Sequence, residues 1–446
     1  MSTLDATGEL AGRTLRKVRR RLLPFMVLLY FVAYLDRGNV SFAELQMGKD
    51  LRLSGAAFGF GAGIFFVGYF LFEIPSNLAL HRFGARRWIA RIVVSWGIVA
   101  SAMLFAHGPV SFSVLRFLLG VAEAGFFPGM ILYLSRWFPA ASRVSMLGLF
   151  ILAQPLSNAL GAPLSGLLLN LDGQFGLAGW QWLFLCEGVP AIVLGLITPL
   201  LLPSHPDDAR WLAADEHAWL TRTLAAEERS KVSAHGWRGG LTDPLVIKLT
   251  VVYFGIVFGT YGLSMWLPTV VKSLGRFSSV QIGAIVLVPY ALAAIGVVLW
   301  SRNSDRTGER HRHTAIAVAL GAIGLVVSVY GQQVSPLLAM AGISLAAIGL
   351  YSALSPFWEL PSAALAGAAA ATGIALINSV GNLAGFLAPY LVGVLKDQTG
   401  STRPGLLMLA AVLLAAAVLV WVIGRRPGRR VGPAGEPVAG VARSAD

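Results

Sequence analysis

The sequence predicts an all-α membrane protein with twelve transmembrane helices in two six-helix, pseudo-symmetric halves. Three observations predict this class: an apolar composition, a series of apolar segments of spanning length, and a repeat at one constant offset between the halves. Of the 446 residues, 56% are hydrophobic and 13% are charged, and the mean hydropathy is +0.69. Because about 20 apolar residues span a bilayer, and such runs recur along the whole chain, a soluble protein is excluded.

The twelve apolar segments divide the chain at one long hydrophilic insert. We expect a basic cytoplasmic tail over 1–21, a first half over 22–202, an interdomain loop with a short amphipathic helix over 203–244, a second half over 245–424 and a basic tail over 425–446. The expected spans lie near 22–43, 57–79, 88–107, 110–134, 143–169, 180–202, 245–271, 278–300, 313–331, 335–357, 366–395 and 404–424.

The distribution of lysine and arginine predicts the orientation. The formal net charge is +13, but the basic residues are scattered in short clusters between apolar runs, which argues against a nucleic-acid surface. With both termini in the cytoplasm, the inner segments hold 27 of the 35 basic residues, the outer loops hold 6, and Arg37 and Arg116 lie inside the membrane. This asymmetry follows the positive-inside rule. A single cysteine, Cys186, excludes an internal disulfide.

The two halves match at an offset of 224 residues. The loop between the second and third spans repeats between the eighth and ninth, and Gln154 and Asn158 in the fifth span repeat as Asn378 and Asn382 in the eleventh. Two six-span parallel repeats are an architecture of secondary transporters, with the site between the halves near the middle of the membrane. The matched loop residues are His81, Arg82, Gly84 and Arg86 in the first half, and Asp305, Arg306, Gly308 and Arg310 in the second.

Four ionisable residues fall inside the expected spans of the first half. Asp36 lies roughly 21 Å along the first span, toward the outer side of the membrane. The fourth span runs in the opposite direction, and Arg116 lies near its outer end at a similar depth. Glu123 follows Arg116 by nearly two turns and shares its helix face, nearer the middle of the membrane. At the 224 offset the second half has neutral residues, namely Thr260, Tyr261, Met340 and Ala347. We expect Asp36, Arg37, Arg116 and Glu123 to meet in a water-filled chamber.

Several stretches together resemble the anion:cation symporter branch of the major facilitator superfamily, which includes bacterial tartrate and 4-hydroxyphenylacetate permeases. They are "YLDRGNVSFA", "EIPSNLALHRFGARRW", "RFLLGVAEAGFFPGMILYLSRWFP", "GWQWLFLCEG", "SPFWELP" and "GIALINSVGNLAGFLAPYLVGVLKDQTG", and the likeness covers about residues 20 to 400. The "DRTGER" loop resembles the loop signature of the superfamily as a whole. One departure is His81, where the superfamily usually has aspartate. The resemblance implies uptake of an organic anion and favours Tyr30, Tyr34 and Tyr253 as cavity residues.

The residues predict a coupling between an anion and protons. Without substrate, Arg37 and Arg116 would neutralise Asp36 and Glu123. A carboxylate substrate that takes over an arginine would leave a side-chain carboxyl without its partner, and that carboxyl would then bind a proton. We therefore predict Asp36 and Glu123 as proton-coupling residues. We predict substrate contacts for Arg37, Arg116, Asn378, Tyr253, Tyr30, Tyr34 and Gln154. The alternative for the four charges is a buried ion-pair network that only ties two helices together.

The two matched loops are predicted as gating latches whose ion pairs form in one state and separate in another. The alternative is that Arg82, Gly84, Arg86, Asp305, Arg306, Gly308 and Arg310 serve only topology and turn formation. The amide side chains in the fifth and eleventh spans could equally be glue between helices. The segment "HRH" at 311–313 lacks a spaced carboxylate or thiol, so we predict no metal site, and no nucleotide loop or other cofactor site is expected.

The predicted function is proton-coupled uptake of a small hydroxy-, sugar- or aromatic carboxylate by alternating access. Alternatives on the same fold are anion exchange and proton-driven efflux, although two intramembrane arginines disfavour cationic drugs. An enzyme would need a clustered nucleophile or metal set, and a sensor would need a larger soluble domain than the insert supplies. We expect a multi-pass protein of the bacterial inner (cytoplasmic) membrane that acts as a monomer, with the anion, protons and lipid as its partners and no nucleic acid.

Overall fold

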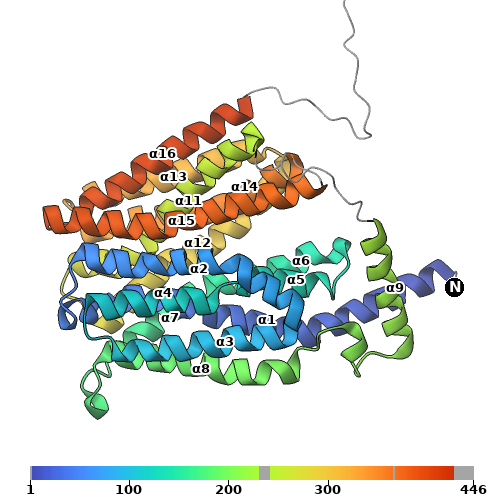
Figure 1. Cartoon of the computed structure of the whole chain (residues 1–446). Helices are drawn as coiled ribbons and strands as arrows, with labels where there is room; N and C mark the ends of the chain where they lie inside the picture. The colour runs from blue at the N-terminus through green and yellow to red at the C-terminus, as the bar shows by residue number, and fades with distance from the viewer. Residues whose placement is uncertain (1–2, 231–241, 365–366, 426–446) are drawn as a thin grey trace, which may run out of the picture.

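The computed structural model describes residues 3–230, 242–364 and 367–425, and the regular secondary structure within them is helical. The helices run nearly side by side in two groups, one below the other in the view of Figure 1. The lower group is formed by the N-terminal part of the chain and the upper group by the C-terminal part. The predicted all-helical class is confirmed.

The N-terminal group begins with one helix that is longer than a bilayer is thick. Helix α1 has 48 residues, roughly 70 Å at 1.5 Å per residue, and its basic N-terminal part extends beyond the other helices toward α9 (Figure 1). The helices of this group are α1 (Thr3–Asp50), α2 (Gly55–Phe83), α3 (Ala85–Ala102), α4 (Pro109–Glu123), α5 (Phe126–Ser135), α6 (Ala140–Ile151), α7 (Ala153–Leu169) and α8 (Gly179–Leu201). Helix α9 (Ala214–Ser230) follows in the insert between the groups.

The C-terminal group contains long helices joined by short connections. They are α11 (Pro244–Ser273), α12 (Ser279–Thr307), α13 (Arg310–Gly331), α14 (Pro336–Ala364), α15 (Gly367–Thr399) and α16 (Arg403–Arg425). Three short 3-10 turns lie in the N-terminal part and its insert, at Met103–Phe105, Gln174–Gly176 and Pro206–Asp208.

The sequence repeat coincides with a repeat of helices. Helices α2 and α12 begin and end 224 positions apart, and so do α8 and α16. Gly84 caps the C-terminus of α2 with a φ of 83°, and Gly308 caps α12 with a φ of 69°. Residues with a side chain rarely adopt this left-handed backbone, so both glycines are required by the turn itself. The repeat therefore reflects two copies of one structural unit.

Ten helical segments in the described residues are long and apolar enough to cross a membrane. They match ten of the expected spans, and α4 and α5 together form one of them. The other two expected spans correspond to α1, which carries Asp36 and Arg37, and to α6 with α7, which are separated at Leu152. The first of these segments carries two charges among its apolar residues, and α6 and α7 are each too short to cross a membrane alone.

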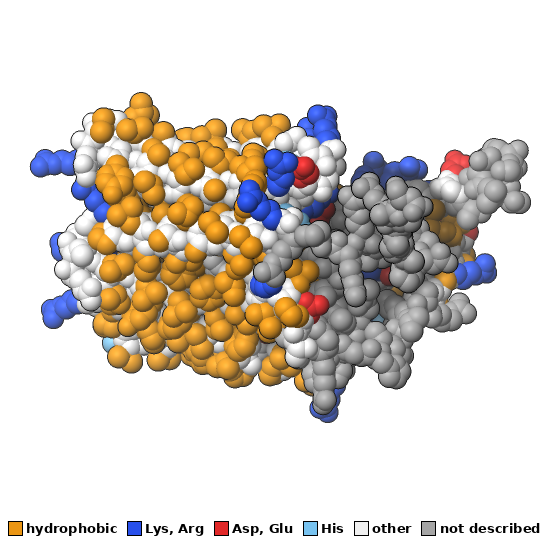
Figure 2. Space-filling view, turned by 90° about the horizontal axis from the view of Figure 1, so that it is seen from above, with side chains coloured by type: hydrophobic (Ala, Val, Ile, Leu, Met, Phe, Trp, Pro, Cys, Tyr) orange, Lys and Arg blue, Asp and Glu red, His pale blue; other side chains and the backbone are white. Residues whose placement is uncertain are grey.

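The outer surface carries the apolar belt of a membrane protein. Figure 2 shows the face of the C-terminal group, where hydrophobic side chains cover the middle and Lys and Arg gather at the two ends. Large apolar residues stay exposed along the helices, among them Ile295, Leu299, Ile323, Leu414 and Val418. A soluble protein rarely exposes so large an apolar patch, and lipid covers such a belt in a multi-pass protein.

Helix α9 is fixed to the N-terminal part of α1 by ion pairs. Glu216 is 2% exposed; its carboxylate lies 2.8 Å from Lys17 Nζ and 3.2 Å from Arg13 Nε, and it accepts from the Ala213 N–H. Burial acts to raise the pKa of this carboxyl, but Lys17, Ala213 and Arg13 hold it below its ordinary value. Because the folded-state pKa is depressed, these contacts stabilise the fold at neutral pH and lose that effect as the pH falls through it.

Glycines bring several helix pairs into backbone contact. Helices α13 and α14 meet at Gly324 and Gly342, where a Cβ on either glycine would overlap backbone atoms of the other helix. Close approach of this kind drives helix association in membranes, where the hydrophobic effect between helices is weak.

We predict that Gly342→Val destabilises the protein by about 1–3 kcal/mol, because the new side chain must push α14 away from Ser328 of α13. Thermal unfolding of the purified protein in detergent measures the effect. Gly108→Ala is the matched control, since a Cβ at Gly108 would meet no atom within 4 Å. Equal melting temperatures for the two variants would contradict this account of the packing.

Candidate functional site

A buried ion pair joins the first and fourth helices. Arg37 of α1 places Nη2 2.5 Å from Glu123 Oε1 of α4, and the two side chains are 12% and 1% exposed. The guanidinium also lies over the rings of Tyr34, Phe65 and Tyr69, with 5.0 to 5.4 Å to the ring centroids. Aromatic faces and a carboxylate therefore replace the water that a cation loses on burial.

Arg116 does not line the pocket described below and has fewer partners than Arg37. It is 1% exposed, Nη2 donates to the Ala62 carbonyl at 3.2 Å, and its guanidinium lies 5.0 Å from the Phe65 ring centroid. Its Nε and Nη1 have no hydrogen-bond partner, and the carboxylates of Glu123 and Asp36 act on it electrostatically. The structure thus brings the four predicted charges into one cluster.

Asp36 is not paired with an arginine, which differs from our expectation. Its Oδ2 accepts a hydrogen bond from the Trp96 indole N–H of α3, while Oδ1 has no hydrogen-bond partner. Asp36 is 1% exposed, as are Arg116 and Glu123. These three side chains are therefore packed in protein, whereas Arg37 lines the pocket described below. The depth of a residue along its span predicts neither its burial between helices nor its hydrogen bond with Trp96.

Two further acidic residues in expected spans were missed by the sequence analysis. Glu187 of α8 is 3% exposed and lies within electrostatic range of Asp36. Glu73 of α2 is partly buried, and Arg37 acts on it. Both could have been found by applying the rule for intramembrane charges to every span, since each interrupts an apolar run.

The helix that carries Glu123 is interrupted directly after it. Helix α4 ends at Glu123, Ala124 has an extended ψ of 135°, and Gly125 has a φ of 82° before α5 begins. A Cβ at Gly125 would overlap the Ser76 side chain, so this break depends on glycine. Discontinuous helices at membrane depth are typical of transporter sites, because they expose backbone groups and permit movement.

A pocket lies between the two groups of helices, and Arg37 reaches it. Among the described residues that line it, Arg37 is the charged one. The polar lining from the N-terminal group also includes Tyr34, Asn39, Ser41, Gln154, Ser157, Asn158 and Ser165. The C-terminal group contributes Thr260, Tyr261, Ser264, Tyr290 and Tyr351.

The internal repeat relates the two walls of this pocket. Thr260 and Tyr261, the counterparts of Asp36 and Arg37, line the pocket from α11. Asn158 of α7 donates to the Tyr351 hydroxyl of α14 at 3.2 Å, which links the two walls. One wall is therefore cationic, and the facing wall offers neutral hydroxyl and aromatic groups.

The remaining predicted contact residues lie at different places. Tyr34 and Gln154 line the pocket. Tyr30 lies behind Tyr34, stacked 4.3 Å from the Phe150 ring, and Tyr253 packs on Phe357 and Trp358; neither lines the pocket. Asn378 is partly buried on α15 and also does not line it.

The two groups of helices are joined at the end of the molecule opposite to α9, which we call the distal end (Figure 1). Glu44 of α1 lies 3.1 Å from Lys396 Nζ of α15 and accepts from the Thr269 hydroxyl of α11 at 2.7 Å. Asp397 of α15 accepts from Gly55 N and Ala56 N at the start of α2, at 2.6 and 2.7 Å. We call these contacts the distal latch.

Small residues extend the distal latch along α2 and α15. Gly55, Gly59 and Gly63 lie one turn apart on α2, and a Cβ at Gly59 would overlap the Pro389 backbone. A Cβ at Gly393 would overlap the Gly55 backbone in the same way. Backbones this close leave no room for water between α2 and α15 along these turns.

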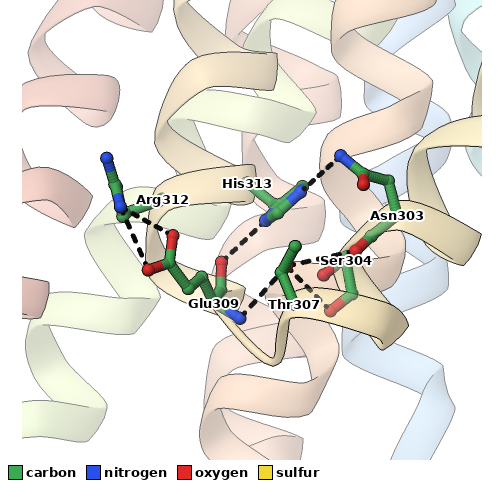
Figure 3. A network of polar contacts seen from close by, with 6 residues as sticks. All are labelled: Asn303, Ser304, Thr307, Glu309, Arg312 and His313. Carbon is green, nitrogen blue, oxygen red and sulfur yellow. Dashed lines mark hydrogen bonds and ion pairs between the residues drawn. The ribbon is translucent and has the colours of Figure 1, made fainter.

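The loop between α12 and α13 is held by local hydrogen bonds (Figure 3). The Thr307 hydroxyl donates to the Asn303 carbonyl, Glu309 pairs with Arg312 at 2.8 Å, and the His313 ring bridges Asn303 and Glu309. Arg310 also pairs with Glu359 of α14 at 2.5 Å, and Arg82 lies over the Phe83 ring at 5.5 Å. The turn glycines and these bonds fit a structural role. The gating role of Arg86, Asp305 and Arg306 stays a prediction.

The comparisons with known proteins agree with this architecture. The model of the Major Facilitator Superfamily matches residues 26–389. A protein of Agrobacterium vitis named "Putative tartrate transporter" is 48% identical over 426 residues, covering 95% of this chain and 94% of that protein. The "Quinolone resistance transporter" of Acinetobacter baumannii is 44% identical, covering 92% and 94%. The crystal structure of a bacterial homologue of the human lysosomal transporter Spinster has a TM-score of 0.77 at 17% identity, covering 92% of this chain and 97% of that chain. The chain belongs to the Major Facilitator Superfamily and is a multi-pass membrane transporter rather than an enzyme.

Proposed function

We propose that the protein takes up a small organic anion together with protons. The observation that carries this proposal is the position of Arg37, which lines the interface pocket and is paired with the buried Glu123. A cation at the wall of a pocket inside a membrane attracts an anionic substrate and gives it a partner that lipid cannot provide. The A. vitis relative with a tartrate name supports a carboxylate as the substrate class.

Binding of the anion is coupled to protonation through the shared arginine. A substrate carboxylate can form two parallel N–H···O bonds with the Arg37 guanidinium, which the single contact with Glu123 does not provide. Glu123 then loses its partner while it remains 1% exposed, and a proton neutralises it. Since linkage is reciprocal, protonation of Glu123 also strengthens anion binding.

Proton coupling also solves an energetic problem of anion uptake. Moving one negative charge inward against an inside-negative potential costs about 2.3 kcal/mol per 100 mV. Each proton that accompanies the anion cancels this cost for one charge. The remaining groups of the cluster, Asp36 and Arg116, lie close enough to one another and to Glu123 to alter its proton affinity.

The topology we propose has twelve spans, with α1 as the first and α6 with α7 as the fifth, and with both termini in the cytoplasm. The two halves are then 22–202 and 245–424, joined by the loop that contains α9. The basic N-terminal part of α1 and the loop of Figure 3 lie on the cytoplasmic side, in keeping with the positive-inside rule. The distal latch then closes the outer side.

Outward transport is the second candidate function. The A. baumannii relative named "Quinolone resistance transporter" favours it, because resistance is obtained by exporting a drug. The same site would then exchange an entering proton for a leaving substrate. The pairing of Arg37 and Glu123 accommodates either direction, because it requires only that anion and proton share one set of partners. The direction of the proton-driven substrate flux in vesicles distinguishes uptake from efflux.

We predict that Glu123→Gln and Asp36→Asn strongly reduce accumulation driven by a pH gradient, while exchange of internal for external anion persists. A neutral amide cannot carry the proton, but it leaves Arg37 available to the anion. Uptake of labelled L-tartrate into proteoliposomes measures both activities. Glu309→Gln, a half-exposed acid in the loop of Figure 3, is the control and should keep wild-type accumulation. Wild-type accumulation in both site variants contradicts the coupling scheme.

We further predict that linking the two groups of helices at the distal end stops transport. In a Cys186→Ser background, cysteines placed at Glu44 and Lys396 lie on facing helices whose native side chains meet at 3.1 Å. A short bismaleimide should join them and reduce L-tartrate flux to the level of empty liposomes, since alternating access requires this end to open. Each single-cysteine variant is the control. Undiminished flux after complete cross-linking would show that the distal latch does not move.

A further inference from the structure

Glu187 is a deeply buried acid that the scheme above does not use. It lies on α8, which packs against α1, α3 and α7. Its Oε1 accepts a long hydrogen bond of 3.4 Å from the Ser165 hydroxyl of α7, and the Asn39 amide of α1 faces it. Its Oε2 has no hydrogen-bond partner of ordinary geometry, and no lysine or arginine among the described residues forms an ion pair with it.

Several polar atoms around Glu187 are buried without a hydrogen-bond partner. Asp36 Oδ1 and Asn39 Oδ1 are acceptors without a donor, and Asn39 Nδ2 is a donor without an acceptor. The charged group that acts on Glu187 is Asp36 of α1, which carries the same sign; α3 contributes Trp96, already bonded to Asp36, and α7 contributes Ser165. One proton on Glu187 would remove a like-charge contact and supply the missing donor.

The charge balance of the cluster favours the same proton. The cluster holds the buried carboxyls of Asp36, Glu123 and Glu187, the partly buried carboxyl of Glu73, and two guanidinium groups, those of Arg37 and Arg116. Glu123 is paired with Arg37, and Arg116 acts on Glu123 and Asp36. Glu187 is the carboxyl left without a cation, and an unpaired buried charge at membrane depth is strongly unfavourable.

The interface pocket reaches Glu187 through two polar side chains. Asn39 and Ser165 both line the pocket, and both approach Glu187 from that side. This route is separate from the one through Arg37 to Glu123. A proton can therefore pass between solution in the pocket and Glu187 without displacing the anion from Arg37.

We propose that Glu187 is a second proton-binding site, loaded from the pocket through Asn39 and Ser165, and that it gives up its proton on the other side of the membrane during each transport cycle. The O–H bond forms with a proton from solution in the pocket and breaks when the pocket faces the opposite solution, so no other reactant is needed. This proposal rests on the proposed proton-coupled function and assigns it one additional proton.

The protonated state is tested first, by infrared spectroscopy of the purified full-length protein without any substrate. We expect a carbonyl stretching band of a protonated carboxyl at neutral pH, which disappears in Glu187→Gln. The band should persist in Cys186→Ser, the neighbouring control, and in Glu187→Asp, which retains a carboxyl. A band that is absent from the wild type, or unchanged in Glu187→Gln, overturns the proposal whatever the transported substrate is.

The transport step is tested by the ratio of protons to anions, obtained from the pH gradient that just balances a known L-tartrate gradient in proteoliposomes. We expect Glu187→Gln to move one proton fewer per anion, whereas a merely structural role would lower the rate and leave the ratio unchanged. An unchanged ratio overturns the transport part of the proposal. If the L-tartrate flux of the wild type did not depend on the pH gradient, the proposed function would be overturned. The infrared result on Glu187 would still stand.

Discussion

The ion pair between Arg37 and Glu123 is the constraint on which the site depends. Glu123 is held away from water and Arg37 is mostly buried, so each charge needs the other, or a replacement, to compensate it. Breaking such a pair by removing one partner costs about 3–5 kcal/mol in proteins. An anion can replace Glu123 beside Arg37, and a proton can then neutralise Glu123. The buried pair therefore favours binding of both the anion and the proton, or of neither.

The fold places this pair beside the elements that can respond to it. Glu123 is the last residue of α4, and the Ala124–Gly125 break follows directly, so a change at the carboxyl is transmitted to a point where the helix is already interrupted. Arg37 belongs to α1, which also carries Glu44 of the distal latch two turns farther along. One helix therefore connects the pocket with the contacts that close the distal end.

Much of the fold could be predicted from the sequence, because apolar length and the 224 offset are local or periodic signals. The offset appears in the structure as helix pairs with matching bounds and as capping glycines at 84 and 308. The clustering of Asp36, Arg37, Arg116 and Glu123 followed from depth. Their partners did not, since Trp96 and Ala62 become neighbours only through packing of α2 and α3. The distal latch was also missed, because its members are isolated polar residues at helix ends, whereas the loop motifs drew attention to the opposite end.

The most direct test of the shared ion pair is proton uptake on anion binding. The purified protein in weakly buffered detergent solution is mixed with L-tartrate, and a pH indicator records protons taken up per protein. We expect uptake by the wild type and its loss in Glu123→Gln, because the anion displaces Glu123 from Arg37 and leaves a buried carboxylate. Binding of the anion without proton uptake, or equal uptake in the variant, would contradict the account.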